Sequence, residues 1–265
     1  VRTGNETKKT VNINLTNCNF DTTKATGRSG LIIMSKTNAT VVLTDTNIKT
    51  LDVPAVQLKD SSNHQTMTVN GGKLDSVSTE YQKQPIKGYD AMIGNVAHRA
   101  FTQAARSVGK GETIKLLQNV STGWVDVPTS CTIDGDGYTV KTDVGTATNN
   151  HTFVIKSNAT DVTFKNMTIV HKRTGHAVRI IKPADVKLEN VTIDATQATD
   201  AYTEGVITID TTGTTNLTLD KVNVDMDTKG DAKDKYGAII RTGVANTSKE
   251  NTVTTPGQSG ADEEE

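Results

Sequence analysis

The sequence predicts an all-β fold in which short strands stack as the coils of a solenoid, and three observations lead to this prediction. An apolar triplet recurs six times, with two alternating members and a third member five residues after the second. A residue type that tolerates left-handed backbone angles follows the second member of most copies. A further apolar strand, often led by Gly, precedes several copies. A single coil of this kind cannot bury its apolar face, so the copies must stack.

The stretch DVKLENVTID at 185–194 shows the apolar triplet. Val186 and Leu188 alternate, so both side chains point to one face of a strand, and Ile193 follows five residues after Leu188. The other copies are Ile13, Leu15 and Phe20; Val41, Leu43 and Ile48; Met67, Val69 and Leu74; Val162, Phe164 and Ile169; and Leu217, Leu219 and Val224. We expect each member to stack inside the coil on its equivalent in the next coil, with Thr, Asn, Lys and Asp facing water.

The position two residues after the second member predicts a sharp corner between two short strands. The six copies place Asn17, Asp45, Gly71, Asn166, Asn190 and Lys221 there. Lys is the exception to the Asn, Asp or Gly pattern, so we expect the coil of Lys221 to turn differently. The upstream strands SGLIIM (29–34), GHAVRI (175–180), EGVITI (204–209) and YGAIIR (236–241) give about three strands per coil. A β-sandwich is the alternative fold, but it does not require one triplet at similar intervals.

The repeat stops near Ser76 and resumes near Thr152, which predicts two modules. Between them, a polar stretch with Pro and Gly is typical of a linker. We expect the last coils of a first module at 1–76, a linker at 77–90, a second module at 91–250, and a polar, acidic linker tail at 251–265.

The second module is expected to begin with a short helix near 100–108. Phe101, Ala104, Ala105 and Val108 have the i, i+3, i+4, i+7 spacing of an amphipathic helix, and Gly109 follows as a C-cap. The stretches ETIKLL, WVDV and CTIDGDGYTV then predict strands, with burial expected for the single Trp in WVDV.

This segment also resembles a known family. The run AMIGNVAHRAFTQAA, then GKGETIKLLQNV, then TSCTIDGDGYTV is similar to the start of right-handed parallel β-helix modules, of the pectate-lyase-like shape, in large surface proteins of Gram-positive bacteria. Glu112 stands where that family usually has Asp, Asp136 where it has Asn, and His98 where an aromatic is common. The likeness covers 91–140 by motif and 152–242 by repeat.

The resemblance implies a right-handed parallel β-helix solenoid, with the short helix capping the open end of the second module. Such a cap covers apolar residues and unpaired strand edges. Because β-helices of this shape include adhesins, stalks, lyases and hydrolases, function must be argued from a site. We expect a non-catalytic extracellular region of a longer bacterial surface protein, acting in adhesion or as a stalk. The alternatives are a polysaccharide lyase or glycoside hydrolase, and a spacer without a ligand.

Two motifs contain residue types that could support chemistry. GHAVRIIK (175–182) holds His176, Arg179 and Lys182, but it lacks the second Gly and the Arg-x-Lys spacing of a polygalacturonase. DGDG (134–137) lacks the regular spacing of a calcium-binding repeat, so we interpret it as a tight turn that needs Gly135 and Gly137. The sequence therefore predicts no catalytic set, no metal site and no cofactor. Cys18 and Cys131 lie far apart, and we expect no disulfide between them.

Ligand binding is expected on two loops at the side of the column, because such loops carry function disproportionately. The loops are DATQATDAYTEG (194–205) and DMDTKGDAKDKYG (225–237). We predict a shallow patch formed by Tyr202, Asp231, Asp234 and Tyr236.

The overall charge limits the partners that this chain can have. A net charge of −1 offers no strong field for nucleic acid or an anionic membrane, and no apolar run reaches the length of a membrane span. We expect a monomer at the cell surface or in the cell wall, with host glycans or extracellular matrix proteins as its partners.

Overall fold

The computed structural model is a β-solenoid of about six turns, with 61% of residues in strands and 6% in helices. It confirms the all-β solenoid that the apolar triplets predict. The structure describes residues 10–24, 32–34, 38–58, 65–83, 86–142, 151–172, 175–198, 205–226, 238–242 and 252–254. Among these residues, no helix combines the length and the apolar character that a membrane span needs.

The chain divides into two compact units, residues 1–104 and residues 105–265. In the first unit, three short ladders of parallel strands form the faces of the coils. The first ladder is β1 (Thr10–Thr16), β4 (Asn38–Thr44) and β7 (Gln65–Asn70). The second is β2 (Asn19–Asp21), β5 (Asn47–Thr50) and β8 (Leu74–Ser76), and the third is β3 (Ile32–Met34), β6 (Val56–Leu58) and β9 (Ile86–Lys87).

A hairpin pairs with the β7 edge of the first unit. It consists of β10 (Ala91–Ile93) and β11 (Val96–His98), and β11 runs antiparallel to β7. A strand edge left unpaired is a site of aggregation, so the hairpin protects β7. Residues 77–90, predicted to be a linker, hold α1 (Thr79–Lys83) and β9, which pairs with β6.

The helix predicted near 100–108 is confirmed as α2 (Phe101–Ser107), which spans the boundary between the two units. Its three apolar residues, Phe101, Ala104 and Ala105, are buried as their spacing predicts, and so is Val108, the residue after the helix. The Asp90 carboxylate accepts a hydrogen bond of 3.0 Å from the Phe101 N–H, which satisfies a free donor of the first helical turn. That the helix caps the second solenoid stays a prediction.

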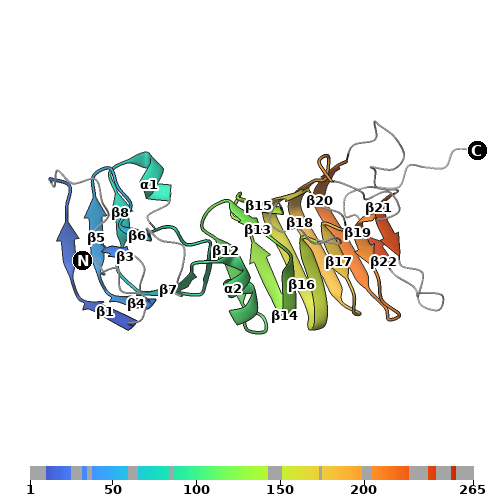
Figure 1. The fold of residues 1–265 in the computed structure, drawn as a ribbon, viewed down its shortest axis with the longest axis horizontal. Coiled ribbons are helices and arrows are strands. Elements are labelled where there is room, and N and C mark those ends of the chain that lie inside the picture. The colour runs from blue at the N-terminus through green and yellow to red at the C-terminus, as the bar shows by residue number, and fades with distance from the viewer. Residues whose placement is uncertain are drawn as a thin grey trace, which may run out of the picture. The chain divides into compact units, whose positions relative to one another are not determined.

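The second unit again has three faces of parallel strands, and its longer strands turn corners from one face to the next (Figure 1). One face is formed by β12 (Thr113–Leu116) with parts of β14 (Val125–Asp134), β16 (Phe153–His171), β18 (Asp185–Asp194) and β20 (Asn216–Asp225), followed by β22 (Thr252–Thr254). The second is formed by β13 (Val120–Thr122), β15 (Thr139–Thr142) and the ends of β16, β18 and β20. The third is formed by the starts of β14 and β16 with β17 (Val178–Ile180), β19 (Gly205–Ile209) and β21 (Ala238–Thr242).

The apolar triplets stack as their spacing predicts. Val162 pairs with Val186, which pairs with Leu217, and all three side chains are buried. Cys131 extends the same row, since it pairs with Val162 and is buried as a small apolar side chain. Burial raises the pKa of its thiol to about 11, and both Cys131 and Cys18 are free.

All six predicted corner residues have left-handed backbone angles, with φ between 46° and 71°. The expectation that Lys221 turns differently is wrong, since its φ of 54° equals that of Asn190. The reason is that pairing continues on both sides of the corner, with Glu189 opposite Asp220 and Val191 opposite Val222. This register forces the corner on Lys221, at a cost of roughly 1 kcal/mol for a residue with a Cβ.

Candidate functional site

The candidate site is a groove at one corner of the second unit, and it exists because one coil has a longer turn than its neighbours. Asp134 pairs with Lys165, and Thr139 pairs with Thr168. Four residues, 135–138, therefore lie opposite only two, 166 and 167, in the next coil. The two additional residues form a wall beside the regular corners of the following coils.

Backbone hydrogen bonds hold this longer turn against the next coil. The N–H groups of Gly135 and Gly137 each donate at 2.8 Å, to the carbonyl oxygens of Lys165 and Asn166. Gly135 packs so closely that a Cβ there would lie 2.3 Å from the Met167 Cβ. Gly137 has a φ of 86°. Both glycines are thus required, as predicted, for different reasons: Gly135 for space and Gly137 for its backbone angle.

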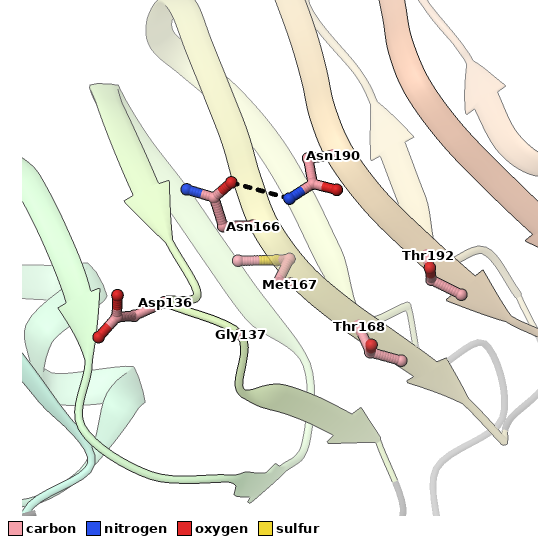
Figure 2. Close-up of a pocket in the computed structure, with 7 residues that line it drawn as sticks. All are labelled: Asp136, Gly137, Asn166, Met167, Thr168, Asn190 and Thr192. Atoms are coloured by element: carbon pink, nitrogen blue, oxygen red, sulfur yellow. Dashed lines mark hydrogen bonds between the residues drawn. The ribbon is translucent and has the colours of Figure 1, made fainter. Parts of the chain in front are cut away.

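A row of polar corner residues forms a directed chain of hydrogen bonds next to this wall. The Asn190 side-chain amide donates to Asn166 Oδ1 at 3.0 Å, and the Asn166 amide donates to Asp134 Oδ1 at 3.2 Å. Figure 2 shows the first of these bonds between neighbouring strands. Parallel strands lie ~4.8 Å apart, so the row presents one polar group per coil at that spacing.

The groove has a volume of about 400 Å³ and is open to solvent along the surface of the unit. Its lining consists of Asp136, Gly137, Asn166, Met167, Thr168, Asn190 and Thr192 (Figure 2). Thr168 pairs with Thr192 in the next coil, so two hydroxyl groups lie side by side along the same face. The groove therefore offers hydroxyl, amide and carboxylate groups on a rigid β-scaffold.

The carboxylates at the groove are neutralised by neighbouring lysines. Lys165 Nζ lies 3.3 Å from Asp134 Oδ2, and Lys115 Nζ lies 3.1 Å from Asp136 Oδ2. Burial raises the pKa of Asp134, but hydrogen bonds from the Asp136 N–H, the Asn166 amide and Lys165 outweigh it, so this pKa lies below its usual range. Asp134 is therefore ionised at neutral pH and already occupied by donors.

No metal centre is found in the described part of the chain, where no three His, Cys, Asp or Glu side chains gather closely enough to hold an ion. The DGDG turn shows why its two carboxylates do not act together. Asp134 is directed to Asn166 and Lys165, whereas Asp136 is directed to Lys115.

The predicted patch of Tyr202, Asp231, Asp234 and Tyr236 lies outside the described residues, so it stays a prediction. The groove was not predicted as a site. Its corner residues Asn166 and Asn190 were identified from the repeat, but only as turn formers. The signal that could have revealed the groove is the longer spacing at DGDG between the two strands, 131–134 and 139–142.

The GHAVRIIK motif takes part in a polar network that is buried at its histidines and partly exposed at its ion pair. His176 and Arg179 meet His151 and Asp210, which come from the neighbouring coils. The His151 and His176 rings stack at 4.9 Å between centroids, and Arg179 forms an ion pair with Asp210. Lys182, by contrast, is exposed to solvent.

Trp124 corrects a further expectation. The sequence predicted burial, but 49% of this residue is exposed. The reason is the alternation of side chains along an extended chain. Val125, the first residue of β14, points into the coil, so Trp124 directly before it points outward.

Comparison with known proteins adds no relative: no family model, no curated protein and no solved structure matches this chain. The fold and the groove are therefore the basis for any functional argument.

Proposed function

We propose that this chain is an extracellular region of a bacterial surface protein that binds a glycan in the corner groove, and so acts in adhesion. The observation that carries the proposal is the pair of Asn amides and the pair of Thr hydroxyls, repeated from coil to coil beside the wall formed by the DGDG turn. Sugar hydroxyl groups both donate and accept hydrogen bonds. Asn amides and Thr hydroxyls do the same, so the two surfaces are complementary.

The geometry of the groove supports an extended ligand. A solenoid repeats one surface along its axis, which creates a long binding face for a chain-like partner. The groove is shallow and open, as suits one stretch of a longer polysaccharide. The assignment to a Gram-positive surface protein, outside the cell, is supported by the motif resemblance at 91–140.

The first experiment compares binding of two double variants to an array of host and plant glycans, with matrix proteins printed beside them. Thr168→Val with Thr192→Val removes both groove hydroxyls and keeps the β-branched shape. The control is Thr132→Val with Thr163→Val, since these residues also pair across neighbouring coils but lie on another face. Each lost hydrogen bond is worth about 1 kcal/mol, so we expect the groove variant to bind at least about fivefold more weakly.

The other possible functions give different results in the same experiment. A blank array for the wild-type chain would contradict glycan binding and favour a spacer. Shortened products after incubation with acidic polysaccharides would favour a lyase or hydrolase. Binding only to a matrix protein would keep adhesion and reject the glycan. Equal loss in the groove variant and the control would place the binding site elsewhere.

A further inference from the structure

Trp124 is the most exposed aromatic side chain among the described residues. Tyr89, Phe101, Phe153 and Phe164 are all at most 1% exposed, whereas Trp124 is 49% exposed. A single exposed apolar residue needs no explanation by itself. The way in which this residue is held is the informative feature.

Two neighbouring side chains fix the orientation of the Trp124 ring. Its Nε1–H donates a hydrogen bond to Asp126 Oδ1. The other carboxylate oxygen of Asp126 lies 2.9 Å from Lys156 Nζ, and that ammonium lies 5.5 Å from the centroid of the Trp124 ring. The indole is therefore held from its edge and from one face. A ring that is already immobilised loses little rotamer freedom when a ligand packs on it.

The surroundings of the ring carry charges that cancel. Asp126 pairs with Lys156, and on the same face of the second unit Arg179 pairs with Asp210. Asp126, Val154 and Arg179 lie in one row across three strands, so both pairs lie on the same side of this face, with the buried Val154 between them. A surface of paired charges does not attract an ionic ligand, but it offers donors and acceptors to an uncharged one.

We propose that Trp124, with Asp126 and Lys156, forms a stacking platform for an uncharged sugar ring. The apolar face of a pyranose covers the indole, while its hydroxyl groups contact the carboxylate and the ammonium. This platform lies at the corner between β13 and β14, whereas the groove lies at the corner between β14 and β15. The platform is thus a second subsite. This inference rests on the proposed glycan-binding function and adds that the glycan is neutral.

The composition of the chain allows a direct test, because it contains one Trp. Its intrinsic fluorescence therefore reports on Trp124 alone. The probes are four neutral hexasaccharides, namely cellohexaose, laminarihexaose, mannohexaose and xylohexaose, together with acidic hexagalacturonate. We expect a saturable change in emission with at least one neutral probe and none with hexagalacturonate. Calorimetry shows independently which neutral probes bind the wild-type chain. If none of the probes that bind changes the Trp124 emission, the platform is overturned.

Variants separate this inference from the proposed function. Trp124→Ala should weaken binding of the neutral probe about two- to tenfold, the range for a lost aromatic contact, and Trp124→Phe should restore part of it. Val77→Ala is the matched control, because Val77 is 48% exposed and lies in the first unit. Binding lost in the groove variant but unchanged in Trp124→Ala would overturn the platform alone. Absence of all glycan binding by the wild-type chain would overturn both proposals.

Discussion

At the scale of single residues, His151 shows how an enclosed polar network determines a protonation state. This side chain is 6% exposed. The His176 N–H donates to its Nδ1 at 3.1 Å, and the Arg179 guanidinium lies 3.1 Å from its Nε2. Both neighbours are donor groups, and a neutral imidazole can accept from only one of them. A protonated ring would carry an N–H at both nitrogens and find no acceptor at either contact. Burial, with the positive charges of His176, Arg179 and His171, lowers the pKa of His151 to about 3, and Asp210 opposes this only in part.

This depressed pKa predicts that acid destabilises the fold. In the unfolded chain His151 titrates near its ordinary pKa of ~6.5, so the unfolded state binds more protons than the folded state between pH ~6.5 and pH ~3. Stability is therefore complete above that range and is lost as the pH falls through it. We expect His151 to account for roughly 1 to 3 kcal/mol of the decrease in unfolding free energy between pH 7 and pH 4.

Urea unfolding of wild type and His151→Asn at both pH values measures this contribution. The Asn side chain can still accept the His176 N–H but cannot titrate. The expected result is a stability difference between the two proteins that shrinks at low pH. A difference that is the same at pH 4 and pH 7 would show that His151 does not titrate in this way.

At the scale of elements, the corners of the coils are the feature on which the candidate site depends. A regular corner needs one left-handed residue, which Asn166 and Asn190 supply. The DGDG turn departs from this rule by two residues and so creates the groove wall. The same turn holds the Asp134 carboxylate that ends the amide chain. One local insertion thus converts a repeating surface into a distinct one.

The two glycines of this turn should respond differently to substitution. Gly135→Ala would place a Cβ 2.6 Å from the Asn166 carbonyl oxygen as well as against Met167, so the turn must move. We expect it to cost about 3 kcal/mol of unfolding free energy and to weaken glycan binding. Gly137→Ala meets no atom within 4 Å, so its cost is only the left-handed angle, about 1 kcal/mol. Thermal or urea unfolding distinguishes the two, and equal costs would contradict the close packing at Gly135.

At the scale of the whole molecule, each of the two units is a stack in which a coil is stabilised mainly by its neighbours. In the second unit, Phe164, Leu188 and Leu219 form one inward row over three successive coils. Phe164 and Leu188 are fully buried, whereas Leu219, nearer the end of the stack, is only half-buried. Burial along a solenoid therefore depends on position in the stack as well as on residue type.

Equivalent Leu residues should then contribute unequally to stability. Leu188→Ala leaves a cavity between two packed coils, and we expect it to cost about 3 kcal/mol of unfolding free energy. Leu219→Ala removes less buried surface, and we expect about 1.5 kcal/mol. Urea denaturation of the two variants measures both costs against the same wild type. A cost for Leu219→Ala as large as that for Leu188→Ala would argue against this view of the stack.

The sequence by itself determined the repeating part of this protein. The alternation of apolar residues and the placing of Asn, Asp or Gly at corners are local properties, and both appear directly in the order of residues. They predicted the stacked triplets and five of the six corners correctly. The helix at Phe101–Ser107 followed from its spacing in the same way.

The candidate sites were decided by tertiary structure alone. The groove exists because the register sets 135–138 beside Asn166 and Met167, and a register between coils cannot be obtained from one strand. Lys221 takes a left-handed angle because paired strands on both sides require it. Trp124 is exposed, and held by Lys156, because the neighbouring coil places that lysine over its ring. Each outcome depends on which residue the next coil brings alongside, and that choice is made only when the coils stack.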